Sequence, residues 1–442
     1  MKYEMMRKAL IILSVASVVF TGCFGGKGGN RGSSNTAPIV ADNSPKTESE
    51  DSLATNAQTA QTVVCEHPAV NVYLENSGSM NGYVDRGRTE FQQAVFNYLT
   101  DINISGIPSE LNLNFINSQV IHKGSVIDDF INRLTPNDFR VAGGNTATTD
   151  IAEIFRTILS KTDPDTVSIF ISDCIFSPGR NNNPKPYLVN QQVGIKQSVA
   201  DYIAEHGRLG MTVYQIYSQF NGRYFDYNNA SRQYQGMRPF YIWVIGSPEH
   251  ILRIRNAVPK EKFQGEVAHD WSIYNTSIDV KYSILPNPKK GSFNKDGATG
   301  MSKIQKDRNG EFMFTIGADL KVLQVMLGDE YLMDTDNYAR LVNKETSRDY
   351  YINVQHNQAQ NSPATHNIEI STEVLPLKGQ FVLQVSCNTP KWAHELTDDD
   401  DSSFNGDNDK KTYGLEYIFN GIQQAFTAHD SNPYARMIFN IK

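Results

Sequence analysis

Glu75, Ser77 and Ser79 are the residues of this chain whose types and spacing best suit cation chemistry. They follow a short apolar strand at residues 72–74, and alternate residues of an extended turn point the same way. Their carboxylate and hydroxyl oxygens can therefore converge on one hard divalent cation, which prefers oxygen ligands. Gly78 leaves room for the turn. The segment predicts a divalent-cation loop at the end of a strand.

Two later segments carry polar groups in comparable positions. A Gly/Thr-rich turn at residues 143–151 runs into a helix, and Asp173 ends an apolar strand at 167–172. A carboxylate after a buried strand needs a partner, because an unpaired buried charge costs several kcal/mol. A nearby cation would satisfy Asp173, and so would capping of the next loop. In the same way, Thr148 or Thr149 could simply cap the helix that follows.

In this order, the three segments resemble the metal-ion-dependent adhesion site of von Willebrand factor type A (vWA) domains. That site consists of Asp-x-Ser-x-Ser, a Gly-rich turn with Thr, and an apolar strand followed by Thr-Asp-Gly. The resemblance covers roughly residues 67–247. It implies that Ser77 and Ser79 bind the metal directly, that Thr149 binds it directly or through water, and that Asp173 and Glu75 act mostly through water. Thr146 and Thr148 are alternative registers for Thr149.

By the same resemblance, the expected ion is Mg²⁺, with Ca²⁺ or Mn²⁺ as alternatives, and an open coordination position would take a carboxylate from a protein partner. The chain departs from the family twice, with Glu75 in place of Asp and Cys174 in place of Gly. The extra methylene moves the Glu75 carboxylate outward. Glu75 could therefore bind the ion itself, change its affinity or occupy the open position.

The elements that would position these residues alternate between strands and helices. Helices are expected at residues 89–99, 127–134, 150–159, 192–205 and 248–258, and strands at 72–74, 111–115, 166–171, 211–217 and 241–245. This alternation predicts an α/β fold, a vWA-like doubly wound, mostly parallel sheet with its ligands beyond the carboxyl ends of the strands. The aromatic-rich residues 217–234 could form a second contact surface or pack back on the domain.

Beyond residue 255 the hydrophobic period changes to two, which predicts a β-rich, sandwich- or barrel-like domain over 256–442. Its strands are expected at residues 271–274, 280–284, 312–316, 350–354, 368–372, 381–385 and 437–441, with one helix near 415–426. The aspartate run at 398–401 lacks the EF-hand pattern and is interpreted as a solvated acidic loop.

The first 66 residues indicate export and anchoring. Residues 1–22 contain basic residues, an apolar core at 9–20 and a Thr-Gly-Cys ending. This resembles a bacterial lipoprotein signal, which implies cleavage before Cys23 and lipidation of its thiol; an ordinary secretory signal is the alternative. Residues 23–66 are expected to be a flexible tether, and 67–255 the vWA-like domain. We therefore expect a lipid-anchored protein of the cell envelope. Because Phe24, after the lipidated cysteine, is not the acidic residue of an inner-membrane retention signal, we favour the outer membrane.

Charge and histidine spacing argue against two classes of function. The formal net charge is −7 without a Lys/Arg stripe, which argues against nucleic-acid binding, and the nine histidines form no His-x-x-x-His pair of the kind that zinc hydrolases use. We therefore expect a non-enzymatic envelope lipoprotein that binds a divalent cation and a protein partner. The alternatives are a metal-dependent hydrolase with Glu75 and Asp173 as an acid/base pair, or a structural lipoprotein with a degenerate metal site.

Overall fold

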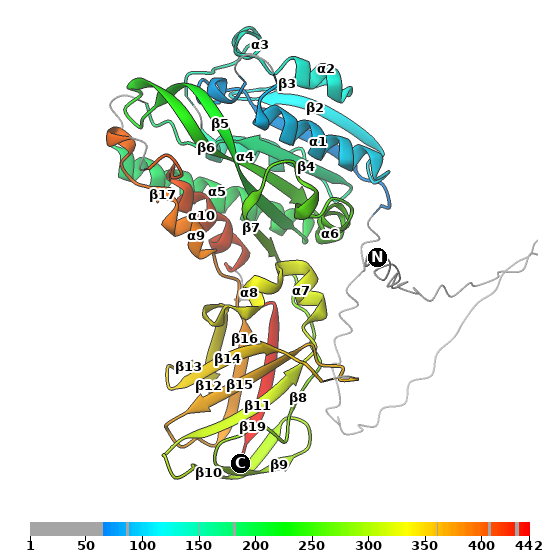
Figure 1. Ribbon diagram of the computed structural model, residues 1–442, viewed down its shortest axis with the longest axis vertical. Coiled ribbons are helices and arrows are strands. Elements are labelled where there is room, and N and C mark those ends of the chain that lie inside the picture. The colour runs from blue at the N-terminus through cyan, green and yellow to red at the C-terminus, as the bar shows by residue number, and fades with distance from the viewer. Residues whose placement is uncertain are drawn as a thin grey trace, which may run out of the picture. The chain divides into compact units, whose positions relative to one another are not determined.

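A computed structural model describes residues 65–84, 88–148, 150–179, 183–359, 361–404, 408–428 and 433–442 (Figure 1). The predicted signal at 1–22, the lipidation site Cys23, nearly all of the predicted tether, and Thr149 lie outside the described residues. Within the described part of the chain, no helix is both long enough and apolar enough to cross a membrane.

The α/β part of the chain is built on a seven-stranded sheet with the strand order β3-β2-β1-β4-β6-β5-β7. Its strands are β1 (Ala69–Glu75), β2 (Glu110–Ile116), β3 (Val120–Gly124), β4 (Thr166–Ser172), β5 (Gly210–Phe225), β6 (Ser231–Gly246) and β7 (Val267–Tyr274). Strand β1 pairs in parallel with both β2 and β4, and the other four pairings are antiparallel. Parallel pairing is thus limited to the three strands whose ends carry Glu75, Asn117 and Asp173.

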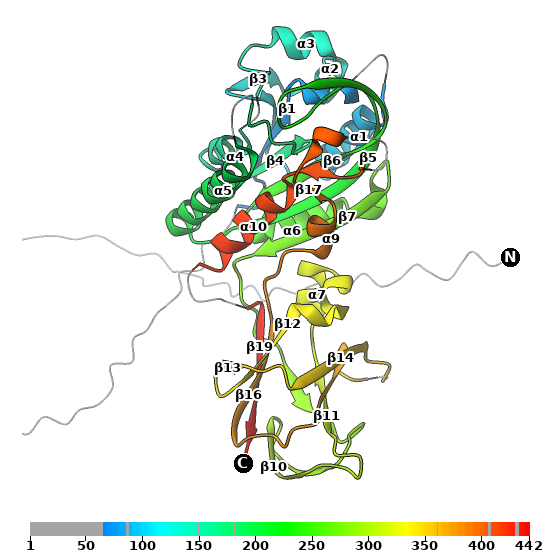
Figure 2. The same ribbon diagram turned by 90° about the vertical axis from the view of Figure 1, so that its left-hand side faces the viewer.

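Helices cover both faces of this sheet. They are α1 (Glu90–Ile104), α2 (Ile127–Asn132), α3 (Pro136–Val141), α4 (Ile151–Leu159), α5 (Pro184–His206) and α6 (Pro248–Ala257). Figure 2 shows α4 and α5 on one side of the sheet and α1 on the other. Because both faces are covered, every residue of β4 is buried, as its uninterrupted apolar run predicts. Helix α1 begins where Thr89 and Gln92 form a capping box.

The hairpin of β5 and β6 is longer than the sequence predicts. The two strands stay in register from the pair Gly210 and Gly246 to the pair Phe225 and Ser231. Its outer half holds much of the aromatic-rich segment 217–234, and Phe220 and Tyr224 are buried there. These two side chains therefore pack back onto the protein, which is one of the two alternatives that the sequence leaves open for the segment.

The sheet also draws on residues beyond position 255, where the sequence predicts a domain boundary. Strand β7 pairs with β5 along its length. The later segment 391–428, with α9 (Lys391–Glu395), β17 (Thr397–Asp398), β18 (Thr412–Tyr413) and α10 (Leu415–Phe426), contacts the α/β layer as well, because α10 packs against α5 and β7. Phe419 of α10 lies against the rings of Trp243 and Trp271.

The remaining strands form two sheets with the orders β13-β12-β16-β19-β10-β9 and β14-β15-β11-β8. The strands are β8 (Tyr282–Ile284), β9 (Ser292–Asp296), β10 (Gly300–Gln305), β11 (Phe312–Ala318), β12 (Tyr338–Val342), β13 (Glu345–Thr346), β14 (Tyr350–His356), β15 (His366–Thr372), β16 (Gly379–Val385) and β19 (Ala435–Ile441). Phe314 of β11 contacts Phe381 and Phe439 of the other sheet, so the two sheets pack face to face as a sandwich.

Two short helices, α7 (Lys321–Leu327) and α8 (Asp329–Met333), connect β11 to β12. Single-turn 3₁₀ helices occur at Ser79–Tyr83, Lys260–Lys262, Thr335–Asn337 and Asp401–Ser403. All pairings in the two sandwich sheets are antiparallel except that of β10 with β19. The coarse prediction of an α/β sheet followed by a β-rich part is confirmed.

Candidate cation site

The strand pairing brings the first and third predicted segments together. Glu75 is the last residue of β1, and Asp173 follows directly after β4. The two strands are parallel neighbours with Leu74 opposite Ile171, so their carboxyl ends meet at the same edge of the sheet. Neither carboxylate side chain is exposed to solvent. Two buried acids therefore lie close together, away from solvent, where an uncompensated charge is costly.

Ser172 holds the Glu75 carboxylate in place. Its hydroxyl donates a hydrogen bond to Oε2 of Glu75 and accepts one, over 2.7 Å, from the backbone N–H of Cys174. Cys174 has a φ of 57°, in the left-handed region that glycine favours. The backbone thus takes the conformation suited to the Gly of the vWA pattern, although a cysteine stands at this position.

The two serines of the first segment lie at the rim of the same site. Their hydroxyl oxygens are 2.9 Å apart, Ser77 is buried, and Ser79 is half-buried at the start of the 3₁₀ helix Ser79–Tyr83. The expected convergence of alternate side chains therefore holds for these residues. Both hydroxyls can turn a lone pair towards a cation, since a hydroxyl is donor and acceptor at once.

Asp173 has one buried carboxylate oxygen without a hydrogen-bond partner among the described residues. Its Oδ1 accepts the N–H of Ile175 over 3.2 Å, while Oδ2 has no hydrogen-bond partner among the described residues. Burial, and then the repulsion of the Glu75 carboxylate, raise the pKa of Asp173 to about 7, against the opposing effects of Ser79 and Arg238. A cation beside the carboxylate would oppose this shift, because it favours the ionised form of Asp173.

The second predicted segment joins the site through its backbone. The N–H of Gly78 donates to the carbonyl of Thr146 over 2.8 Å. Thr149, the predicted ligand of this segment, lies outside the described residues. Of the alternative registers, Thr148 is exposed, and its hydroxyl accepts a hydrogen bond from the side-chain amide of Asn145 over 2.7 Å. The cap of α4 is Asp150, whose side chain accepts the N–H of Glu153.

Asn117 fixes the distance between the first and second loops. Its amide nitrogen donates to Oδ1 of Asn76 over 3.0 Å and to the carbonyl of Gly143 over 2.9 Å. Gly144 has a φ of 76°, and a Cβ there would lie 2.0 Å from Oδ1 of Asn117. A side chain at this position would therefore be strained. Sequence reasoning missed Asn117, although it follows β2 as Asp173 follows β4, and that position was the available signal.

Arg238 of β6 was also missed, and it places a buried positive charge near the acids. Its guanidinium is 5.0 Å from the ring centres of both Tyr224 and Phe404. One nitrogen donates to the carbonyls of Asp409 and Lys411, over 2.6 and 2.9 Å. Nε and the other terminal nitrogen have no hydrogen-bond partner among the described residues. Nothing in the β6 sequence marks this arginine as buried.

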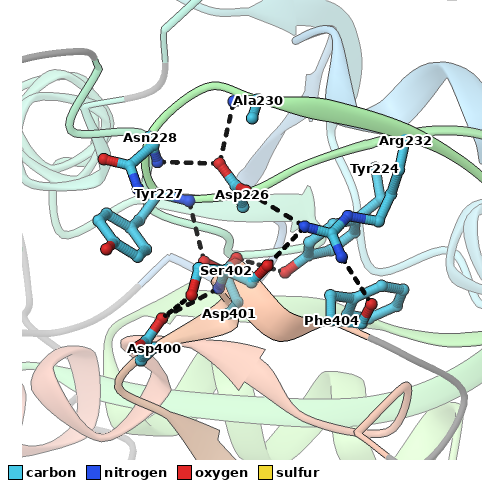
Figure 3. A network of polar contacts seen from close by, with 10 residues as sticks. All are labelled: Tyr224, Asp226, Tyr227, Asn228, Ala230, Arg232, Asp400, Asp401, Ser402 and Phe404. Carbon is cyan, nitrogen blue, oxygen red and sulfur yellow. Dashed lines mark hydrogen bonds and ion pairs between the residues drawn. The ribbon is translucent and has the colours of Figure 1, made fainter.

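The acidic run at 398–401 is not exposed to solvent throughout, contrary to what the sequence predicts. Asp399 and Asp400 are exposed, but Asp401 is buried and accepts the hydroxyl of Tyr224 over 2.5 Å and the N–H of Tyr227 over 2.9 Å (Figure 3). Desolvation raises the pKa of Asp401 to about 6. The tertiary contact with the β5–β6 hairpin, which the local sequence does not reveal, accounts for its burial.

Arg232 completes this network, as Figure 3 shows. Its guanidinium donates to the carbonyls of Ser402 and Phe404, over 2.6 and 2.8 Å, and pairs with Asp226 at 3.3 Å. Phe404 in turn stacks on Tyr224, with ring centres 3.9 Å apart. Residues 401–404 therefore hold the β5–β6 hairpin, which contains Arg238, in place.

Comparison of the chain with known protein families, with curated proteins and with solved structures finds no match. The chemistry of the site therefore rests on its own residues. Glu75, Ser77, Ser79 and Asp173 offer oxygen donors only, a set that suits Mg²⁺, Ca²⁺ or Mn²⁺ and lacks the imidazole and thiolate that zinc prefers.

Proposed function

We propose that this protein is a lipid-anchored protein of the cell envelope whose α/β part acts as a vWA-like domain. In this proposal Glu75, Ser77, Ser79, Thr149 and Asp173 bind a divalent cation, Mg²⁺ first, and the cation takes a carboxylate from a protein partner. The observation that carries it is the buried Asp173 oxygen without a hydrogen-bond partner among the described residues, beside a second buried carboxylate.

The electrostatics favour a cation over an empty site. Two carboxylates without solvent contact repel each other, and a divalent ion offsets both charges at once. The two serine hydroxyls supply neutral donors on the same side, so a metal could be bound without further negative charge. The localisation rests on the sequence around Cys23, and its test is labelling with radioactive palmitate, which Cys23→Ala should abolish.

Isothermal titration of the protein with Mg²⁺, Mn²⁺ and Ca²⁺ tests the metal site. Wild type should bind one ion, and the Ser77→Ala/Ser79→Ala variant should bind it at least about tenfold more weakly. Ser105→Ala/Ser160→Ala, which removes the hydroxyls at the carboxyl-terminal ends of α1 and α4, away from the acids, is the matched control and should bind as wild type does. Absence of binding in wild type at millimolar ion would overturn the proposal.

The partner is tested separately. Binding of envelope proteins to the immobilised protein should be lost in EDTA, restored by Mg²⁺, and absent for Ser77→Ala/Ser79→Ala. Retention of the same partners in EDTA would show that the cation is not the contact. Ester or phosphoester turnover that is lost in the double variant would instead favour the hydrolase.

Arg238 favours one second candidate, a structural protein in which this arginine supplies the counter-charge to Asp173. Its buried guanidinium lowers the pKa of Asp173, as a metal would. The variant Arg238→Met separates the two. Under the metal proposal it should bind Mg²⁺ more tightly than wild type, because a competing cation is gone. Under the structural alternative it binds no ion and loses stability most strongly above pH 7.

A further inference from the structure

A second cluster of ligand-type side chains lies in the sandwich, away from the sequence-predicted site. His356 ends β14, His366 begins β15, and the two are directly opposite each other in the antiparallel pair. Asp329, the first residue of α8, points its carboxylate at both: Oδ2 is 3.0 Å from Nε2 of His356, and Oδ1 is 3.5 Å from Nε2 of His366. Three potential ligand atoms lie within 4.8 Å of one another.

We propose that Asp329, His356 and His366 form a site for a divalent transition metal of the Zn²⁺ class. Ligands at about 2.0–2.1 Å in tetrahedral geometry stand about 3.3 Å apart, which is close to the two separations found here. Two imidazoles and one carboxylate suit Zn²⁺, whereas Mg²⁺ and Ca²⁺ take oxygen ligands. The site therefore calls for a different ion from the serine-rich one.

The buried histidine is set up as a ligand. His366 is completely buried, and its Nε2 has no hydrogen-bond partner among the described residues. Its Nδ1 lies 2.9 Å from the hydroxyl of Thr365, and that hydroxyl donates to the carbonyl of Ala318. When Nε2 binds a metal, the ring proton sits on Nδ1, and the Thr365 hydroxyl is placed to accept it.

Thr365 is itself held in place. Its hydroxyl also accepts the backbone N–H of Leu320 over 2.9 Å, so the group beside Nδ1 of His366 is held by two segments of backbone. Gln324 supports the third ligand in the same way, since its amide donates to Oδ1 of Asp329 over 3.0 Å. Such outer contacts orient the ligands of metal sites.

The exposure of the cluster leaves room for a fourth ligand. His356 and Asp329 are 45% and 42% exposed, while His366 is buried, so the site opens to solvent on one side. Three protein ligands and one water would complete a tetrahedral shell. The metal would join α8 to the ends of β14 and β15, so its binding free energy would add to the stability of the sandwich.

The experiment uses the protein freed of metal by chelator and titrated with Zn²⁺, with excess Mg²⁺ present to fill the serine-rich site. Wild type should bind one Zn²⁺ per chain and unfold at a higher temperature with it. His356→Ala and Asp329→Asn should weaken Zn²⁺ binding by about tenfold to a hundredfold or more. Both side chains are partly exposed, so these variants are expected to fold.

His394→Ala is the matched control. His394 is similarly exposed and lies 2.8 Å from a carboxylate oxygen of Glu416, but no second histidine of the described residues joins that pair. The His394→Ala variant should bind Zn²⁺ as wild type does, and so should Ser77→Ala/Ser79→Ala. Thr365→Val should weaken binding while the protein stays folded. Wild type that binds no Zn²⁺, or binding that survives in both His356→Ala and Asp329→Asn, would reduce the cluster to an ordinary ion pair and overturn the proposal.

Discussion

The Ser172 hydroxyl donates a hydrogen bond to the Glu75 carboxylate, so the ends of two neighbouring parallel strands are joined at the centre of the candidate cation site. The Glu75 side chain is thus held by β4, the strand that Asp173 directly follows. This contact holds the Glu75 side chain next to Asp173, whose pKa the Glu75 carboxylate raises.

Stability should fall with pH because of Asp173. Its pKa is about 7 in the folded protein against an ordinary 3.8, so between these values the folded state holds a proton that the unfolded state has lost. The free energy of unfolding should therefore decrease as pH rises from about 4 to about 7, and level off above. Asp173→Asn should melt a few degrees higher than wild type at pH 8, measured by thermal unfolding.

Saturating Mg²⁺ provides the control for that experiment. If the ion binds the ionised Asp173, it should restore the stability of wild type at pH 8 and leave Asp173→Asn unchanged. Asp401, whose pKa is raised to about 6, contributes in the same direction in both proteins and cancels in the comparison. Parallel pH profiles for wild type and Asp173→Asn would contradict the assignment.

Gly144→Ala should damage the turn that presents the second loop. The left-handed φ and the contact with Asn117 both oppose a side chain there, at a cost of about 1–3 kcal/mol in the free energy of unfolding. Gly106→Ala is the control, because Gly106 has a φ of 70° but nothing within 4 Å of its Cβ position. In urea unfolding the first variant should lose clearly more stability than the second, and only the first should lose Mg²⁺ affinity.

Cys174→Val should destabilise the protein by about 2–4 kcal/mol, because a β-branched residue strongly disfavours a φ of 57°. Cys174→Gly, the residue of the vWA pattern, should be close to neutral, since relief of backbone strain offsets the lost burial of the thiol. Cys387→Val is the comparison at another buried cysteine, one without a positive φ. Equal losses at both cysteines, measured by urea unfolding, would mean that backbone conformation at Cys174 is unimportant.

Asp401→Ala should loosen the β5–β6 hairpin. It leaves the Tyr224 hydroxyl and the Tyr227 N–H without their acceptor in a buried place, which predicts a loss of about 2–4 kcal/mol in urea unfolding. Asp399→Ala, at an exposed position in the same run, should change stability by less than about 0.5 kcal/mol. A similar effect of the two variants would show that Asp401 is no anchor.

Local pattern alone was enough to place Glu75, Ser77, Ser79 and Asp173 at the carboxyl ends of strands, because parallel strands in a covered sheet read as apolar runs that stop at a polar residue. The α/β class followed from the alternation of strands and helices, and the β-rich half followed from the change in hydrophobic period. Tertiary structure decided that β7 and α10 complete the α/β layer, that Arg238 and Asp401 are buried, and that Asp329 meets two histidines. These depend on contacts between residues far apart in the chain, and neither spacing nor composition encodes such distances.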